Sequence, residues 1–143
     1  IGNLWSEAFS KKLPILPLVV NLCHPSPSLG WQNEETISFL QRCKGKFDMI
    51  FFLAVLHHVL VTERVPLHEI ASLLASLTSD GLVIEFIPKE DPKFQEICRG
   101  RDSLFDFYTK ETFLQEFSVF FDVQFSQMQK DGNRCLFFMR KKH

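Results

Sequence analysis

The stretch FDMIFFLAVLHHVLVTERVP, residues 47–66, decides the fold class of this sequence. Its first part, Phe47 to Val55, is a continuous apolar run of strand length, which predicts a strand covered on both faces. Two adjacent histidines, His57 and His58, follow directly. Ligands of parallel sheets bind beyond the carboxyl ends of the strands, so this position is the first candidate site.

Two further apolar runs, Ile15–Asn21 and Leu82–Pro88, predict similar buried strands. The clearest helical pattern, Val65–Gly81, separates the last two strands and carries an apolar stripe. Further helices are predicted at residues 3–11, from Asn33 to Gly45, after Asp91 and after Thr109. Strands that alternate with helices indicate right-handed crossovers and a parallel sheet.

The chain ends in a different pattern. Apolar and polar residues alternate from Phe121 to Ser126, QKDGN at 129–133 predicts a turn, and RCLFFMR at 134–140 returns. This pattern is typical of an antiparallel hairpin. The sequence therefore predicts an α/β fold in three layers with one mixed sheet, formed by residues 1–143 as a single domain.

Composition gives no support to several classes of function. The chain of 143 residues has 16 Lys plus Arg against 17 Asp plus Glu, so it lacks the charge of a nucleic-acid-binding protein. No apolar run reaches the roughly 18 to 20 residues of a membrane span. The four cysteines are widely spaced, which favours reduced thiols over a zinc site and predicts a cytoplasmic protein without a metal.

Three stretches together resemble a known family: ILPLVVNLCHPSPSLGW at 15–31, FFLAVLHHVLVTERVPL at 51–67 and VIEFIPKEDPKFQ at 83–95. They are similar to the bacterial nodulation-type methyltransferases, a branch of the class I S-adenosylmethionine-dependent methyltransferases. The resemblance implies a Rossmann-like sheet with strand order 3-2-1-4-5-7-6 and S-adenosylmethionine as cofactor. In that alignment residues 15–21 form the third strand, 47–53 the fourth, 82–87 the fifth, and the hairpin the sixth and seventh.

The first two strands of that fold have no counterpart in this chain. The glycine-rich loop and the acidic residue that bind the cofactor in the family belong to that missing part. We therefore expect this chain to be the C-terminal two thirds of the domain and inactive alone, with a preceding segment of roughly one hundred residues in the parent protein. A sheet left open at that edge also favours pairing with a second copy, as a homo-oligomer.

The resemblance implies five cofactor-binding residues. Asn21 would accept a hydrogen bond from the adenine amino group, and the amide of Leu22 would donate a hydrogen bond to the adenine ring. The main chain at Leu53 and Ala54 would receive the methionine amino group, and Trp31 would cover the adenine. The residue types also allow a turn-forming Asn21 and a Trp31 that packs on the adjacent helix.

His57 and His58 are the first catalytic candidates, because a neutral imidazole can take a proton from a hydroxyl or amine as it is methylated. Adjacent helical residues point about 100° apart, so at most one is expected to face the substrate. The alternative is one buried histidine bonded to the backbone and one solvated histidine. Adjacent histidines do not form the i, i+4 pair that binds a metal on a helix.

Glu85 interrupts a buried strand and is the third catalytic candidate, as a substrate ligand or a base. Pairing with Arg64, Arg99 or Arg101 is the structural alternative, because buried charges are usually paired. The segment RGRDSLFDFY, residues 99–108, predicts either an acceptor pocket or a surface loop.

These observations predict methyl transfer from S-adenosylmethionine to a hydroxyl or amine of a small molecule or saccharide. A non-catalytic, methyltransferase-like binding or scaffold domain is the alternative. A glycine-rich loop in preceding sequence would favour the enzyme, and its absence would favour the scaffold.

Overall fold

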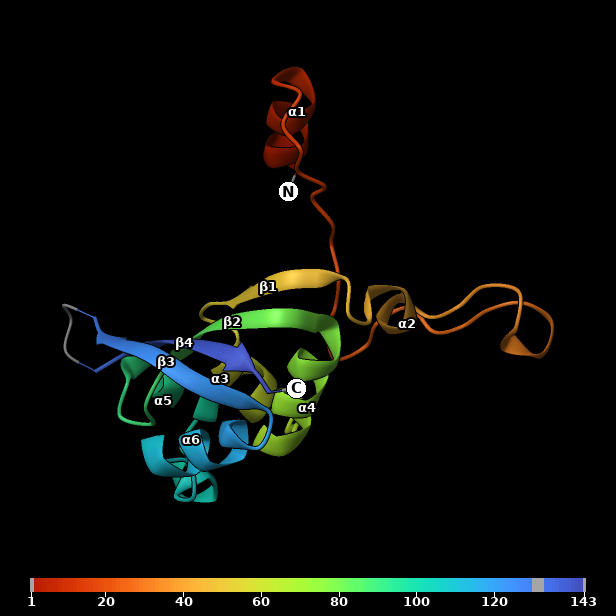
Figure 1. Cartoon of the computed structure of the whole chain (residues 1–143). Coiled ribbons are helices and arrows are strands. Elements are labelled where there is room, and N and C mark those ends of the chain that lie inside the picture. Colours follow the sequence, from red (N-terminus) through yellow and green to blue (C-terminus); the bar gives the residue numbers. More distant parts are fainter. Residues whose placement is uncertain (1, 130–132, 143) are drawn as a thin grey trace. The chain divides into compact units, whose positions relative to one another are not determined.

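The computed structural model describes residues 2–129 and 133–142. The chain divides into two compact units, Ile1–Phe39 and Leu40–His143, which are described separately. Figure 1 labels the helices and strands of both. The organisation of residues 1–143 as a single domain stays a prediction.

The first unit begins with α1, Gly2–Ser10, which confirms the predicted helix. Trp5 and Phe9 stack on one face of α1, with their ring centroids 5.4 Å apart. The strand predicted at residues 15–21 is wrong, because no described strand pairs with this segment. A strand needs hydrogen-bonding partners for its main chain, and here the segment is extended with Leu16 and Val19 exposed by 76% and 82%.

The helix predicted from Asn33 to Gly45 is shorter than expected. Trp31–Asn33 forms the 3-10 helix η1, in which Gln32 and Asn33 have positive φ angles of 55° and 61°. This left-handed backbone cannot start an α-helix, and Leu29 instead bridges to Thr36 across the loop. The α-helical part is α2, Phe39–Cys43.

The second unit contains the remaining elements in the order β1 (Phe47–Phe52), α3 (Leu56–Val61), α4 (Leu67–Leu77), β2 (Thr78–Phe86), α5 (Pro92–Cys98), η2 (Asp102–Phe105), α6 (Lys110–Ser118), β3 (Phe121–Met128) and β4 (Cys135–Lys141). The predicted caps of two helices are confirmed. Asp91 accepts a hydrogen bond from the amide of Lys93 at the start of α5, and Thr109 accepts one from the amide of Thr112 at the start of α6.

The strands form a four-stranded sheet in the order β1-β2-β4-β3. β1 and β2 are parallel, whereas β4 is antiparallel to both β2 and β3. This order is 4-5-7-6 in the numbering of the class I methyltransferase sheet. The α/β class, the mixed sheet and the C-terminal antiparallel hairpin are confirmed; of the predicted turn, residues 130–132 lie outside the described residues.

The predicted boundary between the long helix and the next strand is wrong. α4 ends at Leu77, and β2 already begins at Thr78, so Asp80 and Gly81 lie inside the strand. The buried hydroxyl of Thr78 lies 3.0 Å from the carbonyl oxygens of Phe47 and Gly81. These contacts join the start of β2 to the start of β1 and favour the end of α4 at Leu77.

Helices α3 to α6 lie on the same side of the sheet (Figure 1). The β2 side chains that point toward them are fully buried, and Phe86 packs against Phe113 of α6 with ring centroids 5.3 Å apart. Phe113 also contacts Phe137 of β4 at 5.4 Å. This aromatic core packs against the carboxyl end of β2, next to the site described below.

Candidate functional site

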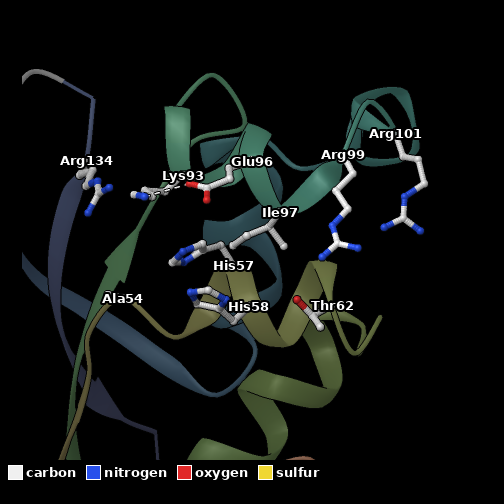
Figure 2. Close-up of a pocket in the computed structure, with 10 residues that line it drawn as sticks. All are labelled: Ala54, His57, His58, Thr62, Lys93, Glu96, Ile97, Arg99, Arg101 and Arg134. Carbon is white, nitrogen blue, oxygen red and sulfur yellow. Dashed lines mark hydrogen bonds and ion pairs between the residues drawn. The ribbon is translucent and has the colours of Figure 1, made fainter.

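A cavity of about 740 Å³ lies beyond the end of β1. It is lined by residues from the β1–α3 connection, from α3, from α5 and the turn after it, and from the start of β4: Ala54, His57, His58, Thr62, Lys93, Glu96, Ile97, Arg99, Arg101 and Arg134. Figure 2 shows these side chains around the opening. The cavity occupies the position where parallel sheets bind their ligands.

Ala54 makes the turn that directs the chain from β1 into α3. Its φ angle is +55°, in the left-handed region that non-glycine residues seldom adopt. Glu85 stabilises this turn, because its Oε2 accepts a hydrogen bond of 2.8 Å from the amide of Ala54. The turn places His57 and His58 in the first residues of α3, beside the cavity.

Glu85 is only 5% exposed, and both of its oxygens are engaged. Oε1 accepts a hydrogen bond of 2.8 Å from Nε2 of Gln129 and lies 3.8 Å from Nη1 of Arg134. The structure therefore pairs Glu85 with Arg134, whereas the predicted partners Arg64, Arg99 and Arg101 are wrong. The reason is topological: β4 lies beside β2, so its residues reach the carboxylate.

Arg134 also binds Asp91 through two hydrogen bonds, Nε to Oδ2 at 2.8 Å and Nη2 to Oδ1 at 3.1 Å. The Arg134 guanidinium holds the pKa of Asp91 below its ordinary value, against the opposing effect of burial. Sequence reasoning missed Arg134 and Gln129 and identified Asp91 only as a helix cap. The available signal was Glu85 itself, because a buried carboxylate requires partners.

His57 is buried, with 3% of its surface exposed, and its pKa is lowered to about 4. Burial is the main cause, followed by the neighbouring His58 and Arg134, while Asp91 acts in the opposite direction. Its Nδ1 is buried and has no hydrogen-bond partner among the residues that the structure describes. His57 is therefore neutral in ordinary conditions and retains an unused polar atom.

His58 is exposed and also lines the cavity. The two imidazole rings lie 4.2 Å apart between centroids with an interplanar angle of 42° (Figure 2). Both histidines line the cavity, and the expectation that at most one faces the substrate stays a prediction. His57 is buried and His58 is exposed, which agrees with the alternative of one buried and one solvated histidine.

Three of the predicted cofactor residues lie in the unit 1–39. Oδ1 of Asn21 accepts hydrogen bonds from the amides of Cys23 at 3.0 Å and His24 at 3.2 Å. This is the geometry of an Asx turn. Leu22 is half-buried, and Trp31 is 78% exposed on η1. Their contacts with a cofactor stay predictions.

The other two, Leu53 and Ala54, follow β1 directly, and Ala54 lines the cavity. No three His, Cys, Asp or Glu side chains within residues 2–129 and 133–142 are grouped to hold a metal. Over the same residues, no helix has the length and apolar character required to cross a membrane.

The strand order β1-β2-β4-β3 and the cavity at the end of β1 agree with the Rossmann-like methyltransferase fold that the resemblance implies. The chain is 35% identical over 103 residues to nodulation protein NoeA of Rhizobium meliloti (strain 1021). This match confirms the similarity to the nodulation-type family. It covers 72% of the chain but 21% of that relative, so the chain spans about a fifth of its length.

No family model matches the chain. Among solved structures, it is similar to magnesium protoporphyrin IX methyltransferase (ChlM) from Synechocystis PCC 6803 with bound SAH. That similarity has a TM-score of 0.46 and 18% sequence identity, and it covers 72% of this chain and 48% of the other.

Proposed function

We propose that this chain is the C-terminal part of an S-adenosylmethionine-dependent methyltransferase that acts in the cytoplasm. Its acceptor is a hydroxyl or amine of a small molecule or saccharide. The observation that carries the proposal is the cavity beyond β1 in a sheet with the 4-5-7-6 strand order. The resemblance of residues 15–140 to nodulation-type methyltransferases supports the same assignment.

The residues at the end of β1 fit a cofactor with a polar methionine end. Ala54 holds a left-handed turn that Glu85 stabilises, so main-chain groups at Leu53 and Ala54 are available without side-chain obstruction. For the adenine end, the family resemblance implies Asn21, Leu22 and Trp31. The bound cofactor supplies an electrophilic methyl group.

Residues of this chain align the methyl acceptor and accept its proton. Methyl transfer depends mainly on holding the acceptor in line with the methyl group, which the cavity walls provide. His57 is neutral because burial lowers its pKa to about 4, so it can accept a hydrogen bond from the acceptor. His58 is exposed to the cavity and takes the proton released by the acceptor.

Glu85 acts as a positioning residue in this mechanism. One of its oxygens binds the amide of Ala54 and the other binds Gln129, so neither is free to act as a base. Its role is to fix the main chain at the end of β1. This assignment replaces the acid–base role that the sequence suggested with a structural role at the same site.

Calorimetric titration of S-adenosylhomocysteine into the complete product of the gene tests the proposal. We expect saturable binding, which Glu85→Ala weakens roughly tenfold because it releases the Ala54 turn. Glu69→Ala, on the exposed face of α4, serves as the matched control and should bind normally. Absence of binding by the unaltered protein would refute the proposal and favour a scaffold domain.

A further inference from the structure

Two arginines at one end of the cavity carry charges that no described carboxylate balances. The side chain of Arg99 forms no hydrogen bond or ion pair with a described residue, and Arg101 uses only Nε, which donates to the carbonyl of Cys98 at 3.1 Å. Figure 2 shows both guanidinium groups on the same side of the opening, away from Arg134. Their terminal nitrogen atoms are free to bind a ligand.

The other charges of the cavity are already paired. Lys93 binds Glu96 at 2.9 Å, and Arg134 is held by Asp91 and Glu85. Asp102, next in sequence to Arg101, acts instead on the thiol of Cys98, whose pKa is raised by burial and then by the Asp102 charge. The excess positive charge is therefore localised at Arg99 and Arg101.

The backbone presents these two side chains together. Arg99 ends α5 in the left-handed conformation, with a φ angle of +51°, and Gly100 follows at +76°. The amide of Arg101 then donates to the carbonyl of Cys98 at 3.1 Å and closes the turn. A left-handed non-glycine residue costs energy, and its presence at a cavity rim is typical of functional sites.

A second observation points to a ligand in the same cavity. His57 is buried, faces the opening between the arginines and Arg134, and leaves Nδ1 without a described partner (Figure 2). A molecule that reaches both His57 and the arginines would carry a polar group at one end and a negative charge at the other. Guanidinium groups bind two oxygens of a carboxylate, phosphate or sulfate through paired hydrogen bonds.

We propose, on the basis of the methyltransferase function above, that the methyl acceptor is an anionic small molecule or saccharide whose carboxylate, phosphate or sulfate group is bound by Arg99 and Arg101. The hydroxyl or amine to be methylated then lies toward His57 and His58. The paired arginines select for acceptors with this charge, because a neutral analogue leaves both guanidinium groups without a partner.

NMR of the arginine Nε–H groups in the complete gene product, without cofactor, tests the anion site. Glucuronate, inorganic phosphate and inorganic sulfate are the probes, and glucose is the neutral control. We expect saturable shifts of Arg99 and Arg101 with at least one anion, and the strongest response identifies the group. The double variant Arg99→Gln and Arg101→Gln should bind that anion at least roughly tenfold more weakly.

Arg64→Gln is the matched control, because Arg64 is exposed and lines a different cavity. Equal weakening in this control, or an equal response to glucose, would overturn the anion site. Saturation with S-adenosylhomocysteine should leave anion binding intact. Displacement of the anion by this compound would assign the arginines to the cofactor carboxylate and overturn the proposal. Anion binding without any S-adenosylhomocysteine binding would refute the methyltransferase function and, with it, the acceptor role.

Discussion

Acidification is expected to destabilise the fold through His57. Its pKa is about 4 in the folded protein, compared with an ordinary value of 6.5. Between these values the unfolded chain binds a proton at this residue and the folded protein does not, so the free energy of unfolding falls as the pH falls below 6.5. Each tenfold difference in proton affinity corresponds to about 1.4 kcal/mol, and the full loss at pH 4 and below is about 3 kcal/mol.

The groups around His57 set the pH range over which the free energy of unfolding falls. Burial is the main cause of the low pKa, with His58 and Arg134 adding to it and Asp91 opposing it. The pKa of Asp91 is itself lowered by Arg134, so its own contribution to stability is lost only at more acidic pH. On the α5 side of the cavity, Lys93 and Glu96 are paired with each other.

Urea unfolding at a series of pH values measures the effect, with His57→Gln as the test variant and Gln95→Ala, an exposed and non-titrating position of α5, as the control. The pH dependence of the unaltered protein minus that of His57→Gln should amount to about 3 kcal/mol between neutrality and pH 4. Gln95→Ala should keep the dependence of the unaltered protein. Parallel curves for the unaltered protein and His57→Gln, or an imidazole NMR signal of His57 that titrates near 6.5, would refute the reasoning.

Three substitutions test the packing that supports the site, each by urea unfolding. Glu85→Ala should cost about 3 kcal/mol, because it leaves the amide of Ala54 and the side-chain amide of Gln129 without their buried acceptor; a loss below about 1 kcal/mol would contradict the network. Thr109→Ala should cost about 1 kcal/mol by removing the cap of α6, and Thr109→Ser should restore it. Phe113→Ala should cost about 4 kcal/mol, and a loss near that of an exposed residue would show that the aromatic core is not rigid.

Sequence reasoning succeeded where structure depends on nearby residues. The apolar run at 47–52 and the alternating pattern at 121–126 predicted strands from local sequence, and Asp91 and Thr109 cap helices through bonds to residues two or three positions away. The prediction that the first of these strands is covered on both faces is wrong, because β1 lies at the edge of the sheet and most of its residues are exposed. The order of the strands followed from the family resemblance, because periodicity does not specify which strands are neighbours.

The failures involve interactions between distant parts of the chain. The run at 15–21 has the composition of a strand, but composition supplies no hydrogen-bonding partner. Thr78 leaves the helix because its hydroxyl meets Phe47, about thirty positions away. The pairing of Glu85 with Arg134 likewise depends on β4 lying beside β2, which the residue types alone do not reveal.

The most direct test of the account is residue-resolved NMR of the complete gene product during titration with S-adenosylhomocysteine. The central claim is that the left-handed turn at the end of β1 and the histidines after it form the methyl-transfer site. We predict saturable shifts of the amides of Leu53 and Ala54 and of the ring signals of His57 and His58. Unchanged signals at these four residues under saturating ligand, or shifts confined to the separate cavity around Leu104 and Phe107, would contradict it.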